Sequence, residues 1–489
     1  MNRVTRRWLL RALFLLFASG LAFLIRPLHH LIRAAGQEEA DLPPLPEGTL
    51  DDASHMSGAE VQELVQVSDR VELAEVLDRA SEAGGAVAIS GVRSTMGGQA
   101  LVDRGTVLDM TGYALVRYKP DREVVVAGAG ATWSALLSEV DGYGRSPAIA
   151  PALADCTVGG ALSVNAYGPQ VGQPPIAAGV VELQVMLADG AIWRCSREEN
   201  EDLFAAVLGG YGLIAVILEA TLATVPNVPC TSSNRLVALE DLASGLVALS
   251  DTPEVELATA SLSLAAESWL QRAAVTIIRS GDGAPQGLTS SGSGWLRDAA
   301  LRGSIDDEYG KWLRWQLQSL LSPLTNATWL SRNTAFNSSI RPMLLPMRSH
   351  SLLLVTLFVP PDNLATLVKQ VRLIVAGHDT ELVDARVNYV GEDHDAVLRY
   401  ATGPVCALQL TFREARLPSG EYRFRELTRT LTERAIDLGG SFFLPYRRHA
   451  SQVQLAKVYA NQVRFLQIKQ RYDPHERFQS SFYRHYINR

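Results

Sequence analysis

The sequence is poor in cysteine, and its cysteines follow no spacing that a metal or disulfide site would use. Cys156, Cys195, Cys230 and Cys406 form no CxxC pair, and no histidine cluster at metal-ligand spacing accompanies them. Neither a disulfide framework nor a zinc site is therefore indicated, and we expect no bound metal. The sequence also shows no Ser-His-Asp set and no paired carboxylates, which argues against a hydrolytic enzyme.

An excess of positive charge is absent as well. The chain has 45 Lys and Arg against 52 Asp and Glu, a net charge of -7, so we expect no binding of nucleic acid. Of its 489 residues 47% are hydrophobic and 20% are charged, which is the composition of a globular protein. This length exceeds what one core usually supports, so two domains are expected.

The amino terminus has an apolar run that is short for a membrane span. The run covers residues 12–25, follows Arg6-Arg7 and is interrupted by Arg26-Pro27. It predicts the core of a signal peptide, and the paired arginines resemble a twin-arginine export signal. The alternative is an uncleaved anchor on the cytoplasmic side, because no clean cleavage site follows and positive charge flanks both ends. Both interpretations predict association with a membrane, and they leave export and cytoplasmic localisation open.

Three glycine-rich segments are the most informative part of the sequence. They cover residues 91–99, 155–168 and 208–217, and each lies beside an apolar run typical of a strand. Glycine lets the backbone approach a ligand directly, and glycine-rich turns present amide groups to phosphates. Before the first segment, residues 71–83 have the apolar period of a helix and residues 86–89 form a strand-like run. Helix, strand and glycine turn in this order are typical of a phosphate-binding α/β unit.

Four motifs, taken together and in this order, resemble those of the vanillyl-alcohol-oxidase family of flavoproteins. They are G-V-R-S-T-M-G-G-Q from Gly91, T-V-G-G-A-L-S-V-N-A-Y-G from Thr157, L-F-A-A-V-L-G-G-Y-G-L-I-A-V-I from Leu203 and Y-D-P-H-E-R-F from Tyr472. The resemblance extends over about residues 54–486 and is weakest over about residues 228–379. Any one motif alone is unspecific, so the set carries the resemblance.

The resemblance implies an α+β fold with a PCMH-type FAD-binding domain of two subdomains and an inserted α+β cap domain for the substrate. We assign residues 54–226 to the FAD-binding domain, 227–440 to the cap and 441–489 to a carboxyl-terminal segment that returns to the flavin. In front of them, residues 1–36 are the predicted hydrophobic signal or anchor segment, and the Pro-rich residues 37–53 are a predicted linker.

The resemblance implies FAD as the cofactor. Ser94 stands where many relatives carry a histidine bonded covalently to the flavin, so we expect non-covalent binding. Cys156 is the alternative attachment point, but free cysteine is usually a buried apolar residue, and we expect no bond there. The predicted cofactor-binding residues are Gly91, Arg93, Ser94, Thr95, Met96, Gly97, Gly98, Gln99, Thr157, Gly159, Gly160, Ser163, Asn165, Ala166, Gly168, Gly212, Ile214 and Val216.

For catalysis the resemblance points to residues 445–450, which face the flavin in the family. Within this run His449 is the predicted base, because histidine can take a hydroxyl proton near neutral pH, and Tyr446 is predicted to orient the substrate or hold its oxyanion. Without the resemblance, a surface histidine beside two arginines would be the better interpretation of His449. Relatives that oxidise sugars often show E-x-R where this sequence has Arg386 and Asn388, which argues against a polyol or lactone substrate.

These observations predict an FAD-dependent oxidoreductase that oxidises an alcohol-type C–H(OH) group by hydride transfer to the flavin. The expected partners are a small-molecule or lipid-linked alcohol or sugar, and oxygen or a quinone as electron acceptor. Two alternatives stay open. The amino-terminal segment favours an oxidase of a lipid-linked sugar that works with a partner reductase, as in the decaprenylphosphoryl-ribose oxidases of the family. The altered residues Ser94, Tyr167 and Asn388 favour a flavin-binding protein without activity.

Overall fold

The structure is a computed structural model, and it describes residues 25–36, 42, 44–289, 295–320, 328–339 and 347–486. The apolar run predicted at the amino terminus lies outside these ranges, apart from its last residue. Within them no helix is both long and apolar enough to cross a membrane.

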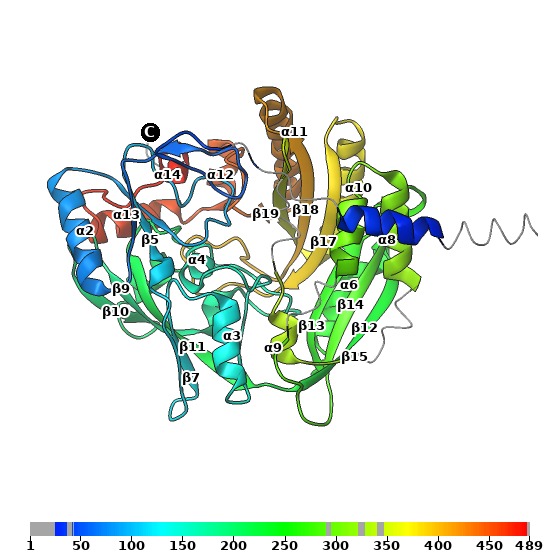
Figure 1. Cartoon of the computed structure of the whole chain (residues 1–489), viewed down its shortest axis with the longest axis horizontal. Coiled ribbons are helices and arrows are strands. Elements are labelled where there is room, and N and C mark those ends of the chain that lie inside the picture. Colours follow the sequence, from blue (N-terminus) through cyan, green and yellow to red (C-terminus); the bar gives the residue numbers. More distant parts are fainter. Residues whose placement is uncertain are drawn as a thin grey trace, which may run out of the picture.

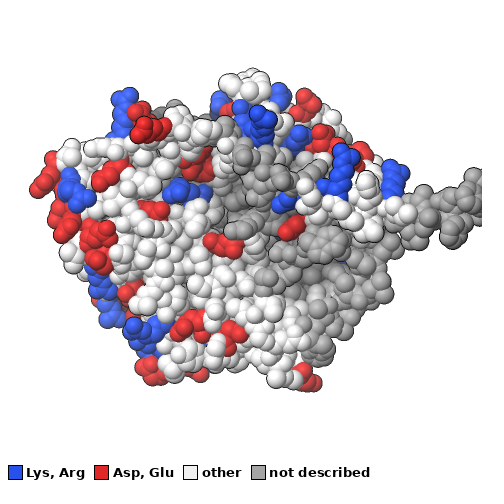
Figure 2. Space-filling model, viewed as in Figure 1, with Lys and Arg blue, Asp and Glu red and all other residues white. Residues whose placement is uncertain are grey.

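The molecule has two lobes (Figure 1). One lobe holds a two-stranded, a three-stranded and a six-stranded sheet and carries the three glycine-rich segments, and the other holds one large sheet backed by helices. The carboxyl-terminal helices return to the first lobe, where Figure 1 shows them in orange and red. Acidic and basic side chains are interspersed on the visible face (Figure 2).

A small parallel sheet with the strand order β3-β5-β4 begins the first lobe, and α2 connects β3 to β4. The helix starts where the Asp69 carboxylate accepts hydrogen bonds from the amides of Val71 and Glu72, and its apolar face is buried as predicted. A separate pair, β1 and β2, precedes this sheet. The bounds are Thr49–Leu50 for β1, Ala59–Glu60 for β2, Glu63–Gln66 for β3, Arg70–Glu82 for α2, Val87–Ser90 for β4 and Thr106–Asp109 for β5.

An antiparallel sheet with the strand order β10-β9-β11-β7-β6 completes the first lobe, and β8 pairs with the end of β11. Gly190 makes the tight turn between β9 and β10 with a φ of +80°, which glycine adopts without strain. The bounds are Val116–Lys119 for β6, Val124–Gly128 for β7, Trp133–Asp141 for α3, Arg145–Pro147 for β8, Val158–Ser163 for α4, Val180–Met186 for β9, Ile192–Ser196 for β10, Glu201–Val207 for α5 and Val216–Pro226 for β11.

The second lobe, called the cap from here on, is built on one antiparallel sheet with the strand order β15-β12-β14-β13-β17-β18-β16-β19. Helices α6, α10 and α11 pack beside one another on this sheet (Figure 1). The strands are Pro229–Ala238 (β12), Val255–Leu262 (β13), Arg272–Ser280 (β14), Thr328–Ser331 (β15), His350–Val359 (β16), Glu381–Val390 (β17), Val405–Ala415 (β18) and Ser441–Phe442 (β19). The helices are Leu239–Ser250 (α6), Trp295–Gly303 (α7), Glu308–Leu320 (α8), Arg332–Phe336 (α9), Leu364–Ala376 (α10) and Pro418–Asp437 (α11).

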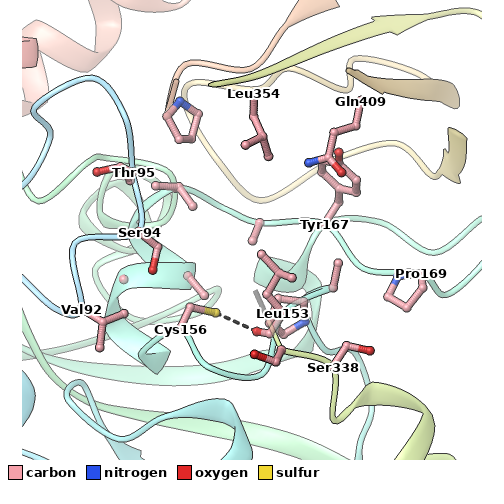
Figure 3. A pocket seen from close by; sticks show the side chains of 18 of the residues that line it. Val92, Ser94, Thr95, Leu153, Cys156, Tyr167, Pro169, Ser338, Leu354 and Gln409 are labelled. Atoms are coloured by element: carbon pink, nitrogen blue, oxygen red, sulfur yellow. Dashed lines mark hydrogen bonds between the residues drawn. The ribbon is translucent and has the colours of Figure 1, made fainter. Parts of the chain in front are cut away.

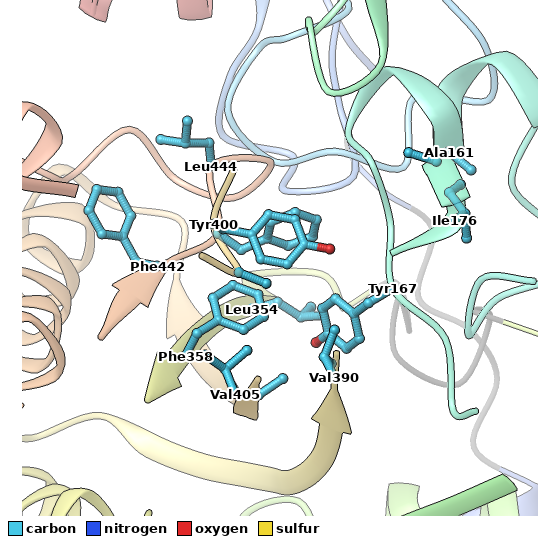
Figure 4. Packing of buried hydrophobic residues seen from close by; sticks show 14 of the residues in the cluster. Ala161, Tyr167, Ile176, Leu354, Phe358, Val390, Tyr400, Val405, Phe442 and Leu444 are labelled. Carbon is cyan, nitrogen blue, oxygen red and sulfur yellow. The ribbon is translucent and has the colours of Figure 1, made fainter. Parts of the chain in front are cut away.

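Tyr167, at the end of the second glycine-rich segment, joins the two lobes through an aromatic cluster (Figure 4). Its ring centroid lies 5.7 Å from that of Phe358 and 5.8 Å from that of Phe443. Phe358 in turn stacks on Tyr400 at 4.5 Å, and the Tyr400 hydroxyl donates a hydrogen bond to the backbone oxygen of Asn165. Tyr167 therefore packs in the core between the lobes.

The Y-D-P-H-E-R-F motif anchors the carboxyl-terminal segment to the third glycine-rich segment. The buried Lys469 donates hydrogen bonds from Nζ to the Asp473 carboxylate and to the backbone oxygens of Leu213 and Phe478. Phe478 also pairs with Val87 of β4. This motif is thus structural, because a buried charge pair with further hydrogen bonds fixes one arrangement of the segments. The segment contains α12 (Gln452–Val458), α13 (Gln462–Tyr472) and α14 (Ser481–Tyr486).

A helix over residues 25–35 packs on the second lobe beside α8, where Figure 1 shows it in blue. Leu31 and Ala34 are buried in a cluster with Ala299 of α7 and Leu313 of α8. The His30 ring nitrogen Nε2 lies 2.9 Å from the backbone oxygen at residue 303. The prediction that residues 1–36 are set apart from the folded body by a linker is therefore wrong for residues 25–36, because one face of this helix has apolar partners on the cap.

Candidate functional site

A cavity of about 890 Å³ lies between the two lobes. The three glycine-rich segments line it from the first lobe, and β12, β13, β14, β17 and β18 line it from the second. Figure 3 shows Ser94 and Thr95 of the first segment, Cys156 of the second, and Gln409 from the cap around this space. Within the described ranges, the lining contains three arginines and no Asp, Glu, His or Lys side chain.

The first glycine-rich segment is held by residues on either side of it in the sequence. Gly98 has a φ of +69°, and its amide donates a hydrogen bond of 2.8 Å to the buried carboxylate of Asp52. Gln99 accepts from the Gly97 amide through Oε1 and donates to the backbone oxygen of Leu444 through Nε2. Asp52 was assigned to the linker at residues 37–53, so sequence reasoning missed its role in shaping the site.

The second segment packs so closely on its neighbours that glycine is required. A Cβ atom on Gly91 would lie 2.3 Å from Oγ1 of Thr157, and one on Gly159 would lie 2.7 Å from the Cβ of Ala129. Thr157 begins α4, because its hydroxyl accepts a hydrogen bond from the Gly160 amide. Gly160 is itself exposed to the cavity, so a side chain at this position would extend into the space.

The third segment is fastened to the second and packs beside the strand that leads into the first. Gly212 has a φ of +70°, and a Cβ atom there would lie 3.4 Å from the Cβ of Ile89 at the end of β4. The Tyr211 amide donates a hydrogen bond of 2.8 Å to the backbone oxygen of Ser163 in the second segment. The three segments therefore form one continuous wall of the cavity.

The predicted cofactor residues divide into a lining set and a supporting set. The lining residues are Gly91, Arg93, Ser94, Thr95, Met96, Gln99, Thr157, Gly159, Gly160, Ser163, Ala166 and Gly212. The structure places the others behind this wall, where they shape the backbone and fill the core. They are Gly97, Gly98, Asn165, Gly168, Ile214 and Val216.

Cys156 lines the cavity, but its thiol is engaged by the backbone. Its Sγ donates a hydrogen bond of 2.9 Å to the Leu153 oxygen (Figure 3). Burial raises the pKa of the Cys156 thiol to about 12, so little of the reactive thiolate exists at neutral pH. Both properties disfavour a covalent bond between this residue and a cofactor.

A row of polar residues crosses the cap sheet at the cavity. Ser261 of β13, Arg386 of β17 and Gln409 of β18 are register partners, so their side chains share one face of the sheet, and all three line the cavity. Gln409 donates a hydrogen bond of 3.1 Å from Nε2 to the hydroxyl of Tyr446. Tyr446 thus lies at the cavity. The sequence analysis did not predict the row, because its members come from three separate strands.

His449 is not among the residues that line the cavity in the described structure. Its side chain is buried, with Nδ1 2.8 Å from Oγ1 of Thr428 and Nε2 2.9 Å from Oε1 of Glu421. Burial lowers the pKa of His449. Both ring nitrogens thus have partners on α11, and this geometry does not support the prediction that His449 is the base. The alternative of a surface histidine is wrong.

The cavity has features that fit a large bound cofactor. The hydroxyl of Thr95 and Oδ1 of Asn388 are buried at the cavity without a hydrogen-bond partner in the described structure. Buried polar atoms are nearly always paired, so a ligand with donors and acceptors would complete them. The glycines of the wall leave backbone open on the same space.

Comparison with known proteins identifies the type of domain. Residues 61–196 match the FAD binding domain family. Cytokinin dehydrogenase 2 of Arabidopsis thaliana is 35% identical over 135 residues, which cover 27% of this chain and 27% of that protein. L-gulonolactone oxidase of Mus musculus is 32% identical over 107 residues, which cover 22% of this chain and 24% of that protein. The chain thus spans about a quarter of the length of these curated relatives.

Proposed function

We propose that this protein, whose FAD binding domain holds FAD as its cofactor, is an oxidoreductase that oxidises an alcohol-type C–H(OH) group. One observation carries the proposal: a single cavity joins the glycine-rich wall of the FAD binding domain to polar side chains of the cap. Cofactor and substrate can therefore meet in one space. Bound FAD supplies the redox chemistry by accepting a hydride. Ser94 and the neutral thiol of Cys156 support non-covalent binding.

The cap residues orient the alcohol in this proposal. The Tyr446 hydroxyl accepts a hydrogen bond from Gln409 and is also in hydrogen-bond contact with Thr356, so a substrate oxygen would share its proton with Thr356. Burial raises the pKa of Tyr446, so the hydroxyl stays protonated at neutral pH. Asn388 Oδ1 offers an acceptor for the substrate hydroxyl. The described lining has no imidazole or carboxylate, so the hydroxyl proton would leave to water as the hydride passes to the flavin, while Tyr446 and Asn388 would hold the oxygen in position.

The acceptor of the electrons and the location of the protein are further proposals. We propose oxygen or a quinone as the acceptor, since reduced flavin must be reoxidised after each turnover. The apolar run and the paired arginines near the amino terminus support association with a membrane, either as a signal or as an anchor.

Anaerobic mixing of the purified protein with candidate alcohols tests the proposal. We expect the yellow absorbance of bound FAD to bleach with at least one alcohol, because hydride transfer reduces the flavin. Admission of oxygen or of a soluble quinone should restore the colour and identify the acceptor. Bound FAD that no alcohol of a broad panel reduces would contradict the proposal and favour a flavin-binding protein without activity.

A further inference from the structure

We infer that the cap side of the cavity binds an oxyanion of the substrate, a carboxylate or a phosphate, through Arg386. The inference rests on the proposed function and names the class of substrate that the same cavity takes. A hydroxyl near the anion would then be the group that is oxidised. The substrate class is an alcohol that carries a carboxylate or a phosphate group.

The charge balance of the lining is the first observation. Its charged side chains in the described structure are Arg93, Arg314 and Arg386. Arg93 belongs to the glycine-rich wall and lies 3.6 Å from Asp109. On the cap side, Arg314 and Arg386 share one carboxylate, that of Asp384. The single negative charge of Asp384 balances only one of these two arginines. One positive charge on the cap side therefore remains, and an anion in the cavity would balance it.

Asp384 positions Arg386 for such a ligand. The carboxylate is buried and accepts a hydrogen bond of 2.6 Å from Nε of Arg386 and another from Arg314. Burial tends to raise the pKa of Asp384, but the charges and hydrogen bonds of the two arginines outweigh it and lower the pKa to about 2. Asp384 stays ionised and engages the Nε edge of the guanidinium. The terminal nitrogens of Arg386 have no protein partner among the described residues, so they can bind an oxyanion.

Asn388 adds a second contact point. It follows Arg386 by two positions on β17, so both side chains leave the same face of the strand, and both line the cavity. Asn388 is 6% exposed, and its Oδ1 has no hydrogen-bond partner in the described structure. Such an atom needs a donor. A fully ionised oxyanion cannot donate, so in this inference a hydroxyl of the substrate supplies the donor.

The proposed anion site lies next to the cofactor side of the cavity. Arg386 is the register partner of Gln409, which donates its hydrogen bond to Tyr446. The residue before Tyr446, Pro445, accepts a hydrogen bond of 2.8 Å from the Met96 amide in the first glycine-rich segment. Two short links thus connect the anion site to the wall of the FAD binding domain.

Titration of the FAD-loaded full-length protein tests the inference without turnover. Oxalate and inorganic phosphate are the two probes, and the visible spectrum of bound FAD reports binding near the flavin. We expect at least one probe to bind, and Arg386→Met to weaken it roughly 30-fold or more, because the charge-assisted hydrogen bonds are lost. Arg386→Lys keeps the charge and should retain part of the affinity. Arg413→Met is the control, because Arg413 is an ion-paired arginine of the same sheet that lies outside the lining. This variant should bind the probes as tightly as the wild type does.

The results of this titration distinguish failure of the anion-site inference from failure of the proposed function. Tighter binding of oxalate would assign a carboxylate, and tighter binding of phosphate would assign a phosphate. If neither probe binds, or if Arg386→Met binds as tightly as Arg413→Met, the inference is overturned, while bleaching by a neutral alcohol would still support the proposed function. If the Arg386→Met variant does not hold FAD, the Asn388→Asp variant is titrated instead. The new carboxylate beside Arg386 should weaken the anion about tenfold or more, and unchanged affinity would overturn the inference.

Discussion

The carboxylate of Glu421 accepts a hydrogen bond of 2.7 Å from Arg447 and lies 2.9 Å from the His449 ring. Glu421 belongs to α11, so this contact ties the run at residues 445–450 to a helix of the cap. Burial tends to raise the pKa of Glu421, but the hydrogen bond to His449 and the charge of Arg447 lower it to about 2. His449 therefore holds the segment in place, and Tyr446 from the same segment reaches the cavity.

The acid stability of the protein should depend on Glu421. A carboxylate whose folded pKa lies below its unfolded value of about 4.3 contributes stability that is full above that value. The contribution is lost as the pH falls from about 5 to about 2. Glu421→Gln should lower the free energy of unfolding by about 3 kcal/mol at neutral pH, and the deficit should shrink below pH 5. Urea unfolding at several pH values measures this deficit in the free energy of unfolding. Glu240→Gln, at an exposed ion pair, serves as the control, and a constant deficit for Glu421→Gln would contradict the assignment.

Tyr446 and His449 should differ in their effect on flavin reduction. Tyr446→Phe removes a hydroxyl that would orient the substrate oxygen and should slow reduction about 100-fold while FAD stays bound. His449→Gln should change the rate less than about threefold, whereas loss of a general base typically costs about 100-fold or more. Anaerobic stopped-flow measurements with an identified substrate compare the two. A large loss with His449→Gln and none with Tyr446→Phe would reverse our assignment.

Gly160→Val should give a folded protein that lacks FAD. The new side chain would extend into the cavity from an exposed glycine of the wall, where its Cβ would meet only the Thr157 hydroxyl in the protein. The FAD content of the purified protein, read from its absorbance, measures the effect. Gly245→Val is the matched control, because a Cβ there meets nothing within 4 Å and the residue lies outside the lining. Normal FAD content in Gly160→Val would disprove this placement of the cofactor.

Acid precipitation should release all FAD into the supernatant. Ser94 cannot form a histidyl linkage, and burial raises the pKa of Cys156 to about 12, which leaves little thiolate for a bond. Fluorescence of the washed, denatured protein on a gel detects any bound flavin. If flavin remains in the pellet of the wild type and is lost with Cys156→Ser, the cofactor is covalent after all.

Removal of the amino terminus should show where the folded body begins. A chain that starts at residue 25 should keep the helix at residues 25–35 on the cap, and one that starts at residue 37 should expose the apolar patch at Ala299 and Leu313. The longer deletion should cost about 2 kcal/mol of stability more, the value of one large apolar side chain. Both should bind FAD, since the cavity wall is intact. Equal stability of the two chains would restore the predicted boundary at residue 36.

Several features of the site were readable from the sequence because neighbouring residues encode them. The helical period and the Asp69 cap define α2, and the strand and glycines after it define the first segment of the wall. Glycine is needed at Gly91 and Gly159 by contacts that leave no room for a Cβ atom, so the motifs themselves carry the fold of the wall. The match of residues 61–196 to the FAD binding domain family agrees with that prediction.

Only the tertiary structure decided which distant side chains shape or face the cavity and which lie outside it. It brought Asp52 against Gly98, packed Tyr167 between the lobes and buried His449 against α11. The row of Ser261, Arg386 and Gln409 depends on the register of three strands far apart in the chain. Local patterns specify helices, strands and turns, but register and side-chain direction between distant strands are set by packing of the whole core.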